Sequence, residues 1–198
     1  MSVIGKHGIS TTTPENILLG AGTWMKNLKW DREARKWNGD VLGATNGGGK
    51  ISIVGEFYDI PVDGQLVKTK GLVVKQGGTV TCEVNFVELS TEIMKMATLF
   101  EEGTTDAEGY TMLKDKAAIS EGDYVENFGF VGYTANNAKM IIFVMENALC
   151  TSGMEIESKN KEAAVVKLTM EAYAENAGDL DTLPVKIYYP ATAAVPGV

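Results

Sequence analysis

The sequence predicts a mainly β fold, an antiparallel β-sandwich or barrel with one flanking α-helix. Apolar and polar residues alternate over several short segments, which is the period-two pattern of half-buried strands. Glycine is frequent and proline is rare, 22 against 5 residues, a balance that suits many tight turns. Strand and helix patterns do not alternate along the chain, so a doubly wound α/β fold is disfavoured.

The alternating segments define the expected strands. The pattern is clearest over residues 80–86, 166–174 and 183–189, where apolar side chains occupy every second position. Residues 140–145 have no polar face, which is typical of a strand covered on both sides. Shorter strands are predicted, with turn signals between them, over residues 19–28, 37–42, 51–57, 66–74, 124–133 and 154–157.

One segment has helical periodicity. Ser90 is a suitable first cap, and Gly103 is a suitable stop. Between them one apolar stripe is formed at helical spacing by Ile93, Met96, Ala97 and Phe100. A short amphipathic helix cannot bury its stripe alone. We therefore predict a helix over about residues 91–100, packed on the sheet face that holds Val84 and Phe86.

The length of 198 residues suits one domain with terminal extensions. We predict an N-terminal arm over residues 1–18, a β domain over 19–190 and a C-terminal tail over 191–198. Residues 101–123 are expected to form a long acidic loop. The arm lacks a core pattern, and we expect it to become ordered only on assembly. The first ten residues lack the apolar segment of a secretion signal, and no apolar run could span a bilayer, so no membrane contact is expected.

The charge is negative and uneven. The net charge of −8 argues against a nucleic-acid-binding protein, because such proteins neutralise phosphates. Residues 101–126 carry eight acidic and two basic side chains, and residues 26–36 carry five basic and two acidic side chains. These segments are either two solvated surfaces or two patches that meet across a subunit interface.

The two cysteines, Cys82 and Cys150, lie far apart in the sequence. Buried free thiols are the favoured interpretation, and a disulfide or a metal pair is the alternative, although no ligand spacing supports it. Synthesis in a reducing cytoplasm is therefore expected.

No arrangement of residues predicts catalysis or cofactor binding. The run from Gly43 to Ile51 has the wrong glycine-to-lysine spacing for a phosphate-binding loop and precedes a strand, so it favours a glycine-rich hairpin connection. The single histidine, His7, lies in the arm, where an imidazole is poorly positioned for catalysis or metal binding. Paired carboxylates stay open as an acid–base possibility, but no spacing singles out a pair. We therefore predict no catalytic, cofactor-binding or metal-binding residues and no enzyme activity.

Three tryptophans, Trp24, Trp30 and Trp37, lie in or beside the basic segment. Aromatic side chains of this kind form sugar-binding platforms in some proteins. Packing in a core or an interface is the more frequent role and is the interpretation that we favour.

Several segments resemble the tail tube proteins, or major tail proteins, of tailed bacteriophages and prophages of Gram-positive bacteria. GATNGGGK at 43–50, DIPVDG at 59–64 and VKTKG at 67–71 resemble the first half of that family. Further segments resemble the second half of that family, namely residues 123–132, 147–149, 153–156, 161–168, 179–184 and 187–190. The likeness spans about residues 14–190 and lies in the order and spacing of the pieces. Gly129 departs from it as a weak strand former.

The resemblance implies a subunit that forms hexameric rings, which stack into a hollow tube for DNA passage from capsid to host cell. The implied partners are copies of the chain, a tape measure protein, tail tip and terminator proteins, and a sheath protein if the tail is contractile. DNA would pass through the lumen without specific binding. The protein would be assembled in the host cytoplasm and reside in the virion. A monomeric β-sandwich module for carbohydrate binding or adhesion is the alternative, and an enzyme is a third possibility.

Overall fold

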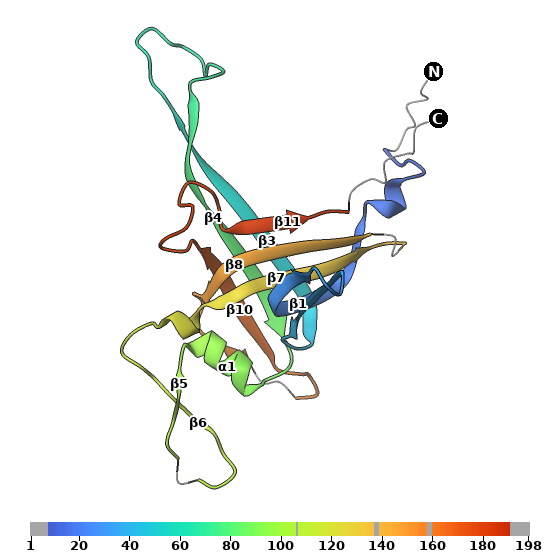
Figure 1. The fold of residues 1–198 in the computed structure, drawn as a ribbon, viewed down its shortest axis with the longest axis vertical. Coiled ribbons are helices and arrows are strands. Elements are labelled where there is room, and N and C mark those ends of the chain that lie inside the picture. The colour runs from blue at the N-terminus through green and yellow to red at the C-terminus, as the bar shows by residue number, and fades with distance from the viewer. Residues whose placement is uncertain (1–7, 106, 137–138, 158–159, 191–198) are drawn as a thin grey trace.

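A computed structural model describes residues 8–190, apart from residues 106, 137–138 and 158–159 (Figure 1). The fold is mainly β, with 51% of the described residues in strands and 8% in helices, and the predicted fold class is confirmed. The strands are β1 (Leu18–Asp31), β2 (Lys36–Val41), β3 (Thr45–Asp59), β4 (Val73–Phe86), β5 (Glu101–Gly103), β6 (Met112–Lys114), β7 (Val125–Thr134), β8 (Met140–Cys150), β9 (Ile156–Glu157), β10 (Val165–Tyr173) and β11 (Val185–Tyr188). The helices are α1 (Thr91–Thr98) and the 3-10 turns η1 (Thr13–Glu15) and η2 (Glu121–Asp123).

One antiparallel sheet carries most strands in the order β2-β1-β7-β8-β10-β4-β3. Strand β8 pairs along one edge with β7, and along the other edge first with β11 and then with β10. The sheet curls over the core until β1 meets β3. At that contact, a side chain added at Gly49 would lie 2.5 Å from the indole ring of Trp24.

The main core lies inside this curl. Trp24 stacks on Phe128 with ring centroids 5.6 Å apart, and it meets the Phe130 ring at a tilt of 52° with centroids 4.9 Å apart. Side chains from β4, β8, β10 and α1 complete the cluster, including Val84, Phe86, Ile93, Met96, Ala148, Leu168 and Met170. This inward-facing set is the alternating set of apolar residues that the sequence predicts.

A second cluster covers the opposite face of β1, β7 and β8. It contains Leu28, Val131, Ile142 and Val144, so β8 is covered on both sides as its apolar sequence predicts. Trp24 and Leu28 would lie on the same face of a regular strand. They lie on opposite faces because the pairing of β1 with β2 shifts between Lys26 and Lys29. Within that bulge Asn27 has a φ of 54° and donates a hydrogen bond to Asp40 Oδ2 at 2.7 Å.

Gly129 lies in the middle of β7, although it is a weak strand former. A Cβ atom there would lie 2.4 Å from Leu28 Cδ2 and 2.8 Å from the Phe143 carbonyl oxygen. Only glycine lets the Leu28 side chain pack so closely on the strand, so this departure from the expected pattern has a packing reason.

The helix prediction is confirmed at its start and in the packing of Ile93, Met96 and Ala97, whereas Phe100 follows the helix and is not part of the core cluster. The backbone N–H of Ile93 donates to Ser90 Oγ at 3.1 Å, which caps the first turn. Ile93 and Met96 join the main core beside Val84 and Phe86. The predicted end is wrong. The helix ends at Thr98, because Leu99 turns into the left-handed region with a φ of 59°.

Two other predictions are wrong. Residues 66–72 are not part of a strand, and β4 begins at Val73. The glycine-rich run is not a hairpin connection, because β3 begins at Thr45 and takes in Asn46 to Lys50. The register with β4 shifts between Thr45 and Gly49, so glycine here permits a bulge that periodicity alone does not reveal.

Candidate assembly surface

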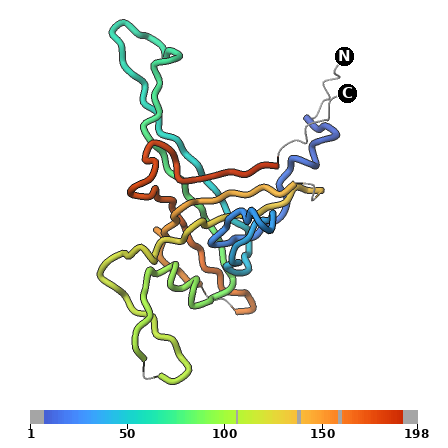
Figure 2. Tube along the Cα trace, in the orientation of Figure 1, coloured from blue at the N-terminus to red at the C-terminus, as the bar shows by residue number. Residues whose placement is uncertain are grey.

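The hairpin of β3 and β4 extends far beyond the body, at the top of Figure 1, and the trace in Figure 2 shows the same extension. Strand β10 pairs with β4 only over Thr81–Phe86. In the described part of the chain, residues 53–59 and 73–80 therefore pair only with each other. We call residues 53–80 the outer hairpin; Val80, at its base, is still buried in the main core.

The outer hairpin is rich in exposed apolar side chains. Leu66 is 96% exposed, Val67 75% and Phe57 70%. The other large apolar residues of this segment that are exposed are Ile53, Val54, Tyr58, Ile60, Val62, Val73 and Val74. Phe57 and Tyr58 are consecutive strand residues and point to opposite faces, so exposed apolar side chains lie on both faces of the hairpin. A concentration of exposed apolar side chains of this kind marks an interaction site.

Glycines mark the waist of the hairpin where it leaves the body. Gly55 pairs with Gly78, and Glu56 pairs with Gly77. A Cβ atom at Gly78 would lie 2.3 Å from the carbonyl oxygen of Val54 and 3.2 Å from Leu183 Cδ2. The two strands and the segment before β11 therefore approach one another too closely for a side chain at this position.

Unpaired strand edges add to the surface. Strands β2 and β3 stand at the two ends of the sheet order. Among the described residues no strand pairs with the outer edge of β2 or of β3 beyond its contact with β1, so these edges present backbone N–H and C=O groups that other chains can pair with.

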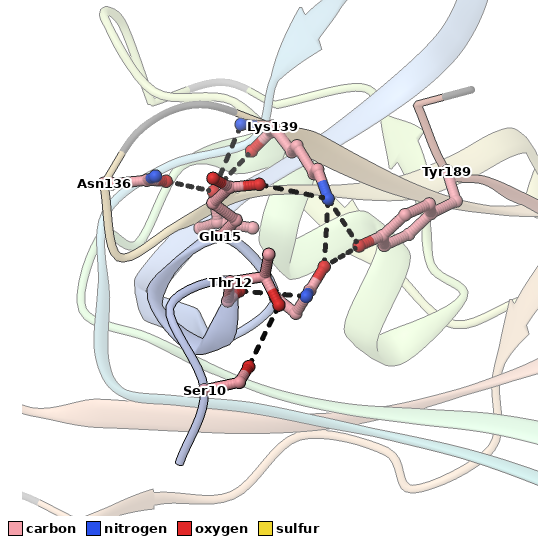
Figure 3. A network of polar contacts seen from close by, with 8 residues as sticks. Ser10, Thr12, Glu15, Asn136, Lys139 and Tyr189 are labelled. Carbon is pink, nitrogen blue, oxygen red and sulfur yellow. Dashed lines mark hydrogen bonds and ion pairs between the residues drawn. The ribbon is translucent and has the colours of Figure 1, made fainter. Parts of the chain in front are cut away.

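A polar network ties both ends of the chain to the body (Figure 3). Asn16 Oδ1 accepts hydrogen bonds from Lys139 Nζ at 2.9 Å and from the Tyr189 hydroxyl at 2.7 Å. Lys139 Nζ also lies 4.0 Å from a carboxylate oxygen of Glu15 and 5.4 Å from the centroid of the Tyr189 ring. The expectation that residues 1–18 are ordered only on assembly is therefore wrong for residues 10–18. Residues 1–7 and 191–198 lie outside the described residues.

The predicted acidic loop contains a second projecting hairpin, β5–β6, and the turn η2, which is fixed to the body. Partial burial alone would raise the pKa of Asp123. The ion pair with Lys116 and hydrogen bonds from the Ser120 backbone and hydroxyl outweigh burial and lower that pKa. The segment is thus folded against the body near its end.

An acidic trough lies beside η2. Two adjoining cavities of about 330 and 770 Å³ share Glu121, Tyr124 and Glu126 in their walls. Glu175 and Tyr173 line the smaller cavity. We define the acidic trough as this pair of cavities.

Trp24 is a core residue, as the favoured interpretation predicts. Trp30 meets Trp37 at a centroid distance of 5.8 Å and an interplanar angle of 66°. Trp37 meets Tyr188 at 4.6 Å and 63°. The three rings pack edge to face, so they do not form one flat platform for a sugar ring.

The cysteines are buried free thiols, as predicted. Cys82 and Cys150 both lie opposite Met170, one on each side of β10. Two strand spacings, roughly 9–10 Å, separate them, which is too far for a disulfide. Burial raises the pKa of the Cys82 thiol and disfavours the reactive thiolate.

No catalytic or ligand residues were predicted, and His7 lies outside the described residues. Among the residues that the structure describes, no three His, Cys, Asp or Glu side chains gather in a way that could hold a metal ion. Within the same residues no helix has the length and apolar character needed to cross a membrane.

The sequence did not predict the outer hairpin as a candidate surface, because its apolar pattern is that of a core strand.

No protein-family profile matches the chain, and no curated protein matches it.

Proposed function

We propose that the chain is the structural subunit of a bacteriophage tail tube. Its copies form hexameric rings that stack into a hollow conduit for DNA. The observation that carries the proposal is the outer hairpin, whose apolar side chains are exposed on both faces. An isolated two-stranded ribbon is marginal in water, so a partner surface would stabilise it.

The resemblance to tail tube proteins supports the same surface. Two of the resembling segments, residues 59–64 and 67–71, form most of the hairpin loop and include the exposed Val62 and Val67. A subunit that buries this loop against the next copy forms a heterologous contact, which generates rings or filaments. Open edges on β2 and β3 offer further pairing between copies.

The remaining parts of the proposal follow from the tube. A tape measure protein, tail tip and terminator proteins, and a sheath protein if the tail is contractile, would be the further partners of the tube. A lumen of acidic and uncharged side chains would let DNA slide, because a basic lining would bind phosphates. The edge-to-face packing of Trp30, Trp37 and Tyr188 gives less support to the alternative of a carbohydrate-binding module.

Negative-stain electron microscopy of the purified chain at rising concentration tests the proposal. We expect sixfold rings and tubes. Leu66→Ser should raise the concentration needed for assembly, whereas Tyr110→Ser, at an exposed position near the tip of the other projecting hairpin, is the matched control. Particles that stay monomeric at every concentration, without induced assembly, would contradict the proposal.

A further inference from the structure

The turn between β1 and β2 concentrates unpaired positive charge. Both arginines of the chain, Arg32 and Arg35, lie there with Lys29 and Lys36 beside them. We call these four residues the basic turn. Each is exposed, and none forms an ion pair within the described chain. By contrast, nine lysines elsewhere have carboxylate partners, namely Lys26, Lys50, Lys68, Lys95, Lys114, Lys116, Lys139, Lys167 and Lys186.

Two acidic residues, Asp31 and Glu33, lie in this turn against the four cations, and one of them is already engaged. Asp31 Oδ1 accepts hydrogen bonds from the backbone N–H groups of Glu33 and Ala34, both at 2.9 Å. This arrangement shapes the turn and uses the Asp31 carboxylate for the backbone. The guanidinium groups are therefore presented to solvent by a fixed turn.

The surroundings of the basic turn have the composition of an interface. Trp30 is 47% exposed and packs edge-on against Trp37. Arginine and tryptophan are enriched where proteins bind one another, and guanidinium groups hold carboxylates with two parallel hydrogen bonds. Strand β2, which carries Lys36, is an end strand of the sheet, and no other described strand pairs with its outer edge. The chemistry of this surface fits a protein partner that presents carboxylates.

The same chain presents such a surface in a different place. Glu121 and Glu126 are exposed in the wall of the acidic trough, and neither has a lysine or arginine partner in the described residues. The cations that line the trough, Lys26 and Lys95, are already paired with Glu92 and Glu102. The trough therefore holds carboxylate charge that the free subunit leaves uncompensated.

We infer that the basic turn of one subunit docks on the acidic trough of a second copy, next to it in the assembly. This contact rests on the proposed function, and it names which surfaces of neighbouring subunits meet. The two surfaces are different, so each subunit offers one of each and the contact repeats from copy to copy around a closed ring. Opposite charges steer the encounter and fix its register.

Charge reversal tests the contact. The variant Arg32→Glu/Arg35→Glu should need at least tenfold more protein to assemble, as should Glu121→Arg/Glu126→Arg. An equimolar mixture of the two should assemble near the wild-type concentration, because each turn then meets a trough of opposite charge. Alternation of this kind closes in a ring with an even number of subunits.

The controls separate the contact from folding and from the proposed function. Arg35→Glu is matched by Lys161→Glu, since both residues are exposed, lack a carboxylate partner among the described residues and have positive φ values of 49° and 67°. Both single variants should melt at the wild-type temperature, and only Arg35→Glu should weaken assembly. Assembly of Arg32→Glu/Arg35→Glu at the wild-type concentration would overturn the inference and leave the tube proposal standing. Wild-type protein that never assembles would overturn the tube proposal itself.

A phosphate-bearing partner is the other outcome. Short duplex DNA titrated into the free subunit at the salt concentration used for assembly should not bind. Binding that is lost in Arg32→Glu/Arg35→Glu would assign the basic turn to nucleic acid and overturn the docking on a second copy.

Discussion

The inner and outer parts of the β3–β4 hairpin both carry large apolar side chains, but their surroundings are opposite. In the inner part Val84 and Phe86 are 0% exposed, because β10, α1 and β1 enclose that face. In the outer part Phe57 is 70% exposed and Leu66 is 96% exposed. Apolar strand residues therefore identify surface that is stabilised by burial, and the packing partner can belong to the same chain or to another chain.

The largest expected difference comes from a pair of phenylalanine truncations in the free subunit. Phe86→Ala should lower the free energy of unfolding by about 3–5 kcal/mol, because it leaves a cavity in the main core. Phe57→Ala should change it by less than about 0.5 kcal/mol, because the ring is already in water. Urea unfolding of both variants measures the difference, and equal losses would break the comparison.

The glycine waist should give a smaller effect. Gly78→Ala places a methyl group 2.3 Å from the Val54 carbonyl oxygen, so the strands must separate, at a cost of about 1–3 kcal/mol. Gly122→Ala is the control, because no atom lies within 4 Å of the added methyl group. Thermal unfolding of the two variants compares them. A Gly78→Ala variant as stable as the wild type would show that the waist is looser than the structure has it.

Exposed segments without apolar cover can instead be held by polar groups, and pH tests this for η2. The pKa of Asp123 is lowered in the folded protein, so its contribution to stability is complete above the ordinary value of 3.8 and is lost as the pH falls through the folded pKa. The stability gap between wild type and Asp123→Asn should therefore shrink below about pH 4. Urea titrations at several pH values measure the gap.

The network at the chain ends should give the smallest effect. Asn16→Ala removes the acceptor for Lys139 and Tyr189, which are near the surface, so the loss should be about 0.5–1 kcal/mol. Local hydrogen exchange at residues 13–18 should increase more than global unfolding does. A loss as large as that of Phe86→Ala would place the network in the core of the fold.

Periodicity predicted the fold class, the helix start and the two-sided burial of β8, because each depends on the pattern of neighbouring residues. It could not place Gly129 or the end of α1. The need for glycine at position 129 comes from its contact with Leu28, which is distant in the sequence. The end of the helix comes from the left-handed backbone conformation of Leu99, which the apolar pattern does not indicate.

The candidate surface was harder to predict than the fold. The residues of the outer hairpin look like core residues, and only the pairing of β10 with residues 81–86 alone reveals that they extend past the body. The charge segments were visible in the sequence. That the cations of the basic turn are unpaired, while Lys26 is bound to Glu92, required the structure.

Hydrogen–deuterium exchange in free and assembled protein tests the central claim most directly. The account predicts that amides of residues 53–59 and 73–80 become strongly protected on assembly, while those of residues 81–86, already paired on both sides, change little. Equal exchange of the outer hairpin in free and assembled protein would mean that no second copy covers it, and would contradict the claim.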